Sequence, residues 1–399
     1  MKKTIKDIDL KNKRVLVRVD YNVPINDKGE VEDDTRIRES LPTINYLLEQ
    51  NCAIILMSHL GRPKGKPDEK YSLKPVAKRL EELLNRKIIM AKGIVDEETK
   101  KLASELKNGE IMLLENVRFD PREEKNDEEF AKELASLVGK EGVFVQDAFG
   151  SVHRAHASTH AVAKFLPAVC GFLVEKEIMY FDKVLTSPER SFIAILGGAK
   201  VSDKIGVIEN LLDKVDAIII GGAMAYTFLL SEGISVGNSL VEKDKVDYAK
   251  ELLNKARQKN VNILLPIDHI VVQKIDPEAE TKYIDTADIP EGYIGVDIGK
   301  NTISRVANVI LSAKTIVWNG PMGIFEIDKF ALGTKQIATL ITEATQKGAT
   351  TIVGGGDSVA AIKKFGLEGG FSHVSTGGGA SLELLEGKKL PGIEVLLDK

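Results

Sequence analysis

Residues 192–198 read FIAILGG, and residues 216–222 read DAIIIGG. In both stretches a short apolar run ends in a pair of glycines, and a segment with helical periodicity follows. A strand that is apolar throughout, rather than at alternate positions, is typical of a parallel sheet with both faces covered. These stretches therefore predict an α/β fold built on a parallel sheet.

The same pattern recurs along most of the chain. The second half also contains NILLP (262–266), KTIVWNG (314–320) and TTIVGGG (350–356), while the first half contains RVLVRVD (14–20), AIILMS (53–58), IMLLEN (111–116) and GVFVQD (142–147). A chain of 399 residues is too long for one ordinary core. We therefore predict two domains, each built on a parallel α/β sheet.

The predicted boundary falls where the two series of strands are furthest apart. There, Gly171, the charged helix-like stretch VEKEIMYFDKVL and Ser187-Pro188 separate the series. We predict an N-terminal domain at 1–172, a connecting helix and hinge at 173–190 and a C-terminal domain at 191–380. Residues 381–399 contain no further strand-helix unit, and we expect them to pack on one of the domains, with a return to the N-terminal domain as one alternative.

The composition excludes several classes of protein. The chain has 55 Lys and Arg residues against 59 Asp and Glu residues, so it lacks the basic excess of a nucleic-acid-binding protein. The longest uncharged run, Ala217 to Ser231, is interrupted by glycines and is shorter than the roughly 18–20 residues of a membrane span. Two cysteines are too few for a disulfide framework, and the charged N-terminus is not a secretory signal. We predict a cytoplasmic protein.

Cationic and polar side chains follow the strands of the first half. Ligands of open α/β sheets bind beyond the carboxyl ends of the strands, so these residues are expected to share one site. Arginine binds phosphate and carboxylate groups bidentately, and several arginines from separate loops indicate a compact anionic substrate. The candidates are Asp20, Asn22, Arg36, Arg38, His59, Arg62, Arg118, His153, Arg154 and His156.

Glycines follow the strands of the second half, among them Gly197-Gly198 before Lys200 and Gly354 to Gly356 before Asp357. Glycine lets a backbone approach phosphate closely, and a helix start beyond such a loop supplies N–H groups. This half is therefore predicted to bind a nucleotide. Neither G-x-x-x-x-G-K-[ST] nor G-x-G-x-x-G occurs, so the phosphate contacts must differ from those of an ordinary P-loop or dinucleotide fold.

Three other features have simpler readings. The spacing of His153, His156 and His160 can suggest a metal site, but histidines beside an anion site more often act as hydrogen-bond donors. The hydrolase-like pattern GISVG (233–237) follows a segment that predicts a helix rather than the required strand. Cys52 opens an apolar strand and is expected to be a packed thiol.

Eight stretches, in this order along nearly the whole chain, resemble phosphoglycerate kinases. They are RVDYNVP (18–24), SHLGRP (58–63), ENVRF (115–119), DAFGSVHRAHAS (147–158), GGAKVSDKI (197–205), WNGPMGIFE (318–326), VGGGDS (353–358) and VSTGGGASLELLEG (374–387). The chain departs from many relatives at Lys300, where proline is frequent, and at Gln146, where asparagine is frequent.

The resemblance implies a fold of two doubly wound, Rossmann-like parallel-sheet domains joined by a helix, with a substrate cleft between them. It also implies reversible phosphoryl transfer between 1,3-bisphosphoglycerate and ADP, giving 3-phosphoglycerate and ATP, by a monomer that closes about a hinge. The substrate positions it implies are Asp20, Asn22, Arg36, His59, Arg62, Arg118 and Arg154. The implied positions for the Mg²⁺ nucleotide are Lys200, Lys204, Gly295, Glu326, Gly355, Gly356, Asp357 and Ser358, with Glu326 on the ribose and Asp357 on the metal.

Phosphoryl transfer requires in-line positioning and positive charge around the moving group. We expect Arg36, Lys200, Mg²⁺ and the helix start at Gly378 to supply that charge. The alternatives are an ATP-dependent kinase of another small carboxylate and a non-catalytic two-domain anion-binding protein.

Overall fold

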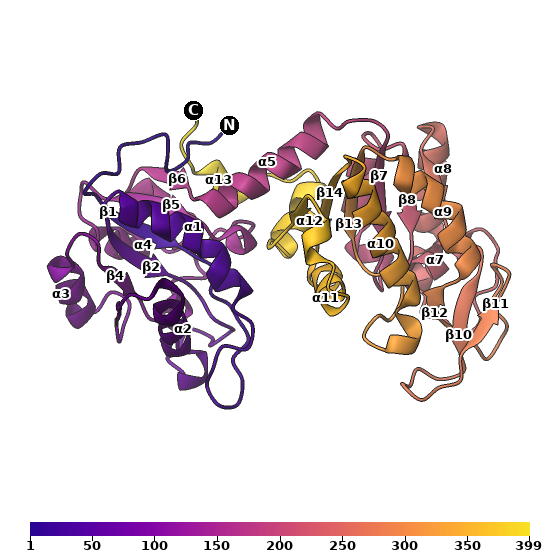
Figure 1. The fold of residues 1–399 in the computed structure, drawn as a ribbon, viewed down its shortest axis with the longest axis horizontal. Coiled ribbons are helices and arrows are strands. Elements are labelled where there is room, and N and C mark those ends of the chain that lie inside the picture. The colour runs from indigo at the N-terminus through magenta and orange to yellow at the C-terminus, as the bar shows by residue number, and fades with distance from the viewer. The chain divides into compact units, whose positions relative to one another are not determined.

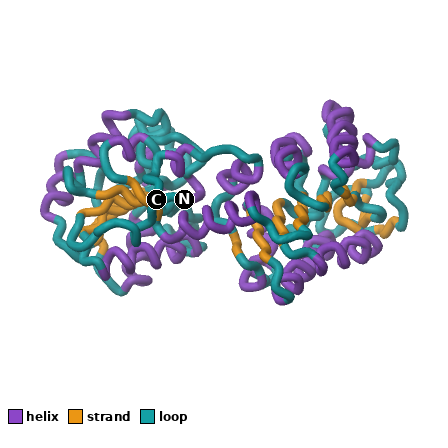
Figure 2. The backbone as a smooth tube through the Cα atoms, turned by 90° about the horizontal axis from the view of Figure 1, so that it is seen from above, coloured by secondary structure: helices purple, strands orange, loops and turns teal.

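The computed structural model describes the whole chain, Met1–Lys399, and it divides into two compact units. The first unit contains Met1–Met179 and Lys389–Lys399, and the second contains Tyr180–Lys388. Each unit has a parallel six-stranded sheet. Helices cover the sheet in each unit (Figures 1 and 2). The predicted α/β fold with two parallel sheets is confirmed.

In the first unit the strand order is β3-β4-β2-β1-β5-β6. The strands are β1 (Arg14–Arg18), β2 (Ala53–Met57), β3 (Ile88–Met90), β4 (Ile111–Leu113), β5 (Val143–Gln146) and β6 (Ala168–Cys170). The helices are α1 (Thr35–Glu49), α2 (Lys74–Leu84), α3 (Glu97–Glu105), α4 (Glu128–Ser136), the first part of α5 (Phe172–Thr186) and α13 (Pro391–Glu394). The short 3₁₀ helices η2 (Val117–Phe119) and η3 (Phe149–Ser151) follow β4 and β5.

The apolar strands of the first unit form its core, because β2 is buried along its whole length and β1 is buried after its first residue. Both chain termini belong to this unit. The Lys3 N–H donates to the Leu397 carbonyl at 2.7 Å, and Lys2 pairs with Asp398 as an isolated β-bridge. The returning segment begins at Lys389, later than the predicted 381, because α12 (Gly379–Leu385) packs on α6 (Ile205–Leu211) of the second unit.

In the second unit the strand order is β15-β14-β13-β7-β8-β9. The strands are β7 (Phe192–Leu196), β8 (Ala217–Ile220), β9 (Asn262–Leu264), β13 (Thr315–Asn319), β14 (Thr350–Gly354) and β15 (His373–Val374). Besides α6 and α12, the helices are α7 (Met224–Ser231), α8 (Val246–Gln258), α9 (Lys300–Ser312), α10 (Leu332–Gln346) and α11 (Gly356–Lys364).

The second unit also has an antiparallel sheet that the sequence analysis did not predict. It contains β10 (His269–Val272), β11 (Lys282–Ile284) and β12 (Ile294–Ile298), in the order β11-β10-β12. β11 has no fully buried residue, and the sequence of β12, IGVDI, is interrupted by a glycine and an aspartate, so these strands lack the continuous apolar run of a strand such as β7.

Each parallel sheet reverses its order at one point. In the first unit the chain builds outward from β1 through β2 and returns to place β5 on the other side of β1. In the second unit β7 is flanked in the same way by β8 and β13. Loops that leave neighbouring strands at such a switch point separate and form a crevice, which is the usual ligand site of this architecture.

Candidate active site

In the first unit, the loops that follow β1, β2 and β4 are joined by hydrogen bonds. The Asn22 side-chain oxygen accepts from the Gly61 N–H at 2.9 Å, and Arg118 donates from Nη1 to the Gly61 carbonyl at 2.9 Å. Arg36, in the first turn of α1, donates from Nη1 to Asp20 Oδ2 at 2.7 Å. The first helix is thereby tied to the loop after β1.

Two buried histidines lie within the field of several arginines. Burial lowers the pKa of His59 well below its usual 6.5, and Arg18, Arg118 and Arg36 lower it further. Burial and Arg118 lower the pKa of His156 to about 4. Both imidazoles are therefore neutral at physiological pH, and the arginines supply the positive charge of the site.

All seven side chains that the sequence assigned to the substrate belong to this cluster. Arg62 and Arg154 are exposed, and both act on Arg118, whose pKa is lowered by burial and by these two cations. We call the group the cationic loop cluster: Asp20, Asn22, Arg36, His59, Arg62, Arg118 and Arg154. Such a set, with one carboxylate among four arginines, fits a small ligand that carries several negative charges.

Three residues beneath the cluster were not predicted from the sequence. Arg18, only 1% exposed, donates from Nε to Ser158 Oγ at 2.8 Å and places Nη2 3.1 Å from His59 Nδ1. Glu123 is fully buried and accepts from the Ser158 N–H at 2.7 Å. An arginine inside an apolar strand such as RVLVRVD was the available signal, because a fully buried arginine requires partners.

In the second unit, the loops after β7, β8 and β13 pack backbone to backbone. The Gly198 N–H donates to the Pro321 carbonyl at 3.1 Å, and the Gly222 N–H donates to the Met322 carbonyl at 3.0 Å. These bonds fix the three loops as one surface at the carboxyl edge of the sheet.

The glycines of these loops have two different roles. A Cβ atom on Gly197 would lie 2.1 Å from the Pro321 carbonyl oxygen, and one on Gly320 would lie 2.2 Å from the Gly197 carbonyl oxygen. These glycines are therefore required for loop packing, whether or not a ligand approaches them. Gly198 and Gly356, by contrast, have open space where a Cβ would be, so a ligand can reach their backbone.

Lys204 is a buried cation beside these loops. Its side chain lies next to Asn319, whose Oδ1 accepts from Nζ, and the residue is only 9% exposed. Burial lowers the pKa of this amine from 10.5 to about 8, although Asp203 and Asp357 favour the charged form. A poorly compensated lysine directly before the start of α6 is well suited to an anionic ligand.

The first turn of α11 carries two polar side chains, the exposed Asp357 and the buried Ser358. Gly355 precedes the helix with φ of 94°, a conformation that favours glycine, and Asp357 is exposed in the first turn. Ser358 is buried, and its Oγ accepts from the Gly320 N–H at 2.6 Å. Ser358 therefore joins α11 to the loop after β13, while Asp357 remains accessible.

The other predicted residues of this unit lie at several places. Lys200 is exposed after the Gly197-Gly198 turn, and Gly378 directly precedes α12. Glu326 is exposed in the loop after β13. Gly295 is buried in β12, where its N–H donates to Ser239 Oγ at 2.9 Å.

Other chemistries find little support. No group of three or more His, Cys, Asp or Glu side chains is arranged to hold a metal ion. Ser235 follows α7, so the strand that a nucleophile elbow requires is missing. Cys52 is buried, as expected, and burial raises the pKa of its thiol to about 11. No helix is long and apolar enough to cross a membrane.

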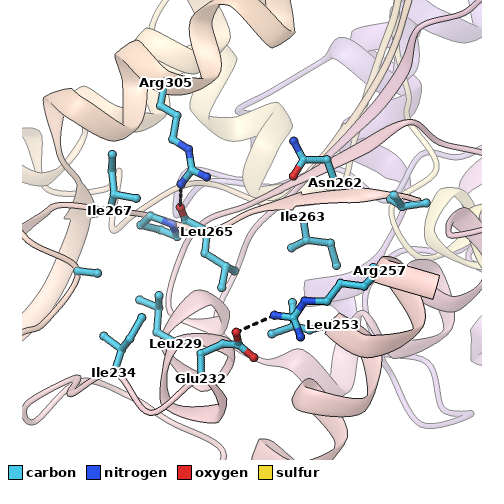
Figure 3. Close-up of a pocket in the computed structure, with 14 residues that line it drawn as sticks. Leu229, Glu232, Ile234, Leu253, Arg257, Asn262, Ile263, Leu265, Ile267 and Arg305 are labelled. Carbon is cyan, nitrogen blue, oxygen red and sulfur yellow. Dashed lines mark hydrogen bonds and ion pairs between the residues drawn. The ribbon is translucent and has the colours of Figure 1, made fainter. Parts of the chain in front are cut away.

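A separate pocket of about 320 Å³ lies beside the edge strand β9 (Figure 3). Most of the lining residues are apolar, and they come from α7, α8 and β9 and from the loops beside these elements. Arg257 on its rim is paired with Glu232 at 2.7 Å, and Arg305 donates to the Leu265 carbonyl at 3.4 Å. None of the predicted site residues lines this pocket.

The match to a protein family agrees with this arrangement of loops. The family model described as phosphoglycerate kinase matches residues 5–388. The chain belongs to the phosphoglycerate kinase family. It is 55% identical over 399 residues to the phosphoglycerate kinase of Fervidobacterium nodosum, covering all of this chain and 99% of that protein.

Two solved phosphoglycerate kinases have the same fold over the full length. The structure from Coxiella burnetii has a TM-score of 0.89 and 41% identity, covering 99% of this chain and 98% of that one. The structure from Pyrococcus horikoshii has a TM-score of 0.84 and 33% identity, covering 98% of both chains. The chain is accordingly a kinase that carries out the glycolytic phosphoryl transfer between bisphosphoglycerate and ADP.

Proposed function

We propose that the first unit binds 3-phosphoglycerate or 1,3-bisphosphoglycerate at the cationic loop cluster and that the second binds ATP or ADP at its glycine loops. The convergence of Arg36, Arg62, Arg118 and Arg154 around buried neutral histidines carries this proposal. Four guanidinium groups match a small ligand with a carboxyl group and one or two phosphates. Asp20 and Asn22 orient Arg36 and the loop that begins at Gly61.

The nucleotide half is assigned from the exposed and the buried groups of the second unit. Lys204 contacts the terminal phosphates, because an anion there compensates a buried cation. Gly355, Gly356 and Ser358 shape the start of α11 beside those phosphates. We assign Glu326 to the ribose hydroxyls, and Gly295 to the wall of the nucleoside site.

In the transfer step, charge on the moving phosphoryl group must be neutralised as it leaves one oxygen and approaches the other. Arg36 and Lys200 are both at least partly exposed, and we assign them to this task. The backbone at Gly378 is the third contributor. No protein nucleophile is needed, because the two substrates can react directly once their atoms are about 3–3.5 Å apart.

Asp357 is the residue that would hold Mg²⁺. Its exposed carboxylate beside the glycine loops fits a magnesium ion bound by one protein carboxylate together with the phosphates of the nucleotide. Bound Mg²⁺ supplies positive charge to the phosphate oxygens. Lys204 and the backbone N–H groups of the loops orient the same phosphates.

Direct transfer requires the two units to bring their ligands together, and we propose closure about the hinge at 173–190. We further propose that the enzyme acts as a monomer in the cytoplasm. The two buried free thiols, Cys52 and Cys170, support a reducing compartment.

Steady-state turnover with Mg-ATP and a series of acceptors tests the proposed function. We expect 3-phosphoglycerate to be phosphorylated with a kcat/KM at least about 10³-fold above that of glycerate or acetate, because those acceptors leave arginines unpaired. Comparable turnover of acetate would favour the kinase of another small carboxylate. Binding of 3-phosphoglycerate without any turnover would favour the non-catalytic protein.

A further inference from the structure

The hydrogen bond between Arg18 and His59 has a consequence for the substrate site. We propose that Arg18 is a positioning residue that holds His59 as the neutral tautomer with its proton on Nε2, so that His59 donates a hydrogen bond to an oxygen of the phosphoglycerate. The second part of this inference rests on the proposed function. The first part concerns only the chain itself.

The chemistry of the contact decides the tautomer. Arg18 Nη2 lies 3.1 Å from His59 Nδ1. A guanidinium has only donors, so Nδ1 must be the acceptor and cannot carry a proton. An imidazolium has a proton on both ring nitrogens and cannot accept this bond. The proton of His59 must therefore be on Nε2.

Arg18 is held so that it cannot turn away. Its Nε donates to Ser158 Oγ at 2.8 Å, and its Nη1 donates to the Val19 carbonyl at 2.5 Å. The buried carboxylate of Glu123 attracts the guanidinium, and it also accepts from the Ser158 N–H at 2.7 Å. The direction of the Arg18 fork is thus set by three separate elements of the first unit.

The charged and titratable groups around His59 favour the same state. Burial opposes its protonation most strongly, and four neighbouring groups oppose it as well. They are Arg18 at the end of β1, Arg118 from η2, Arg36 from α1 and His156 from the loop after η3. His59 therefore stays neutral well below pH 6.5, and its donor capacity does not depend on pH in the physiological range.

The Nε2–H group is available to a ligand. Arg18 contacts Nδ1 and leaves the other ring nitrogen to a ligand, and His59 keeps 6% of its surface exposed. Oxygen atoms of phosphate and carboxylate groups are acceptors, so an Nε2–H is attractive to them and an Nε2 lone pair would be repulsive. The neutral donor binds the substrate without adding another charge to a site that already contains several arginines.

The tautomer can be read directly by a long-range ¹H–¹⁵N correlation spectrum of histidine-labelled, full-length enzyme without ligand. We expect His59 to show an unprotonated Nδ1 and a protonated Nε2, unchanged from pH 8 to pH 5.5. A protonated Nδ1 or an imidazolium in this range overturns the inference. Because no substrate is present, this result is independent of the proposed function.

Variants then connect the tautomer to binding. Arg18→Lys should give a mixture of tautomers and raise KM for 3-phosphoglycerate about tenfold with a smaller change in kcat, which is the effect of one lost hydrogen bond to a charged group. Arg14→Lys is the matched control on the same strand, since the Arg14 guanidinium contacts the Leu106 carbonyl away from the site. It should leave the spectrum and KM unchanged.

A double-mutant cycle separates positioning from direct contact. His59→Gln offers an amide donor near the position of Nε2, so Arg18→Lys should raise KM for 3-phosphoglycerate much less in that background than in the wild type. An equal rise in KM in both backgrounds would mean that Arg18 binds substrate itself, and would overturn its positioning role. If Arg18→Lys does not fold, Ser158→Ala, which removes the acceptor for Arg18 Nε, should give the same mixed tautomers, and a wild-type spectrum from it would count against the inference.

Discussion

Lys204 gives the sharpest quantitative test, because its burial links stability to nucleotide binding. In the free enzyme its pKa is lowered from 10.5 to about 8, and burial is the main cause. The unfolded chain therefore binds this proton more tightly than the folded chain, and stability must rise as the pH increases from 8 toward 10.5. Below pH 8, the lowered pKa makes the folded chain less stable by roughly 3 kcal/mol than it would be if the pKa of Lys204 were the same in the folded and unfolded chains.

Lys204→Met removes the pH-dependent contribution of Lys204 to the free energy of unfolding while keeping a side chain of similar length. Between pH 7 and pH 9.5, the free energy of unfolding of the wild type should increase by roughly 2 kcal/mol relative to that of Lys204→Met. Urea denaturation at both pH values measures this difference. The exposed Lys200 provides the control, because Lys200→Met should follow the wild-type pH dependence.

The same variant must lose nucleotide affinity. An anion beside Lys204 restores its charged form, so nucleotide binding at pH 8 should also take up a proton, which calorimetry in buffers of different ionisation enthalpy detects. Parallel stability curves for wild type and Lys204→Met, together with unchanged nucleotide affinity, would refute the reasoning.

Three further outcomes follow from the proposed roles. Arg36→Ala should lower kcat about 10²–10³-fold with little change in KM. The control is Arg38→Ala, which should have near wild-type kinetics because the partner of Arg38 is Asp34. A raised KM with a normal kcat would show that Arg36 does not act in the transfer step. Asp357→Ala should shift the Mg²⁺ dependence of turnover to higher concentration, with the exposed Asp328→Asn as control, and identical Mg²⁺ curves would contradict the assignment. Small-angle scattering should give a smaller radius of gyration with 3-phosphoglycerate and a non-reacting Mg-ATP analogue together than with neither, and an unchanged radius would count against closure.

The sequence predicted the parallel sheets because their strands are buried on both faces and are therefore apolar throughout, as in FIAILGG. It did not predict the antiparallel sheet of β10, β11 and β12. Polar residues or glycine interrupt them, as Lys282 does in β11 and Gly295 and Asp297 do in β12, and the apolar part of β10 is limited to residues 270–272. None of them therefore has the longer apolar run that marks a strand such as β7.

The cationic loop cluster could be predicted because most of its residues lie in loops that follow strands, and parallel strands bring their carboxyl ends to one edge. Arg36 is the exception, since it lies in the first turn of α1. Arg18 and Glu123 could not be assigned in this way. Their role depends on contacts with Ser158 and His59, which are distant in sequence and meet only in the folded chain. The glycines were also ambiguous, since packing of Gly197 against Pro321 and open backbone at Gly198 leave the same sequence signature.

The proposed binding of one substrate to each unit is tested most directly by chemical-shift mapping of the full-length enzyme. Titration with 3-phosphoglycerate alone should shift the backbone amide signals of Asn22, Gly61 and Arg118 and leave those of Gly198 and Gly356 in place. Titration with Mg-ADP alone should shift the signals of Gly198 and Gly356 and leave those of Asn22, Gly61 and Arg118 in place. Shifts at Gly198 and Gly356 caused by 3-phosphoglycerate, with none at Asn22 or Arg118, would contradict the account.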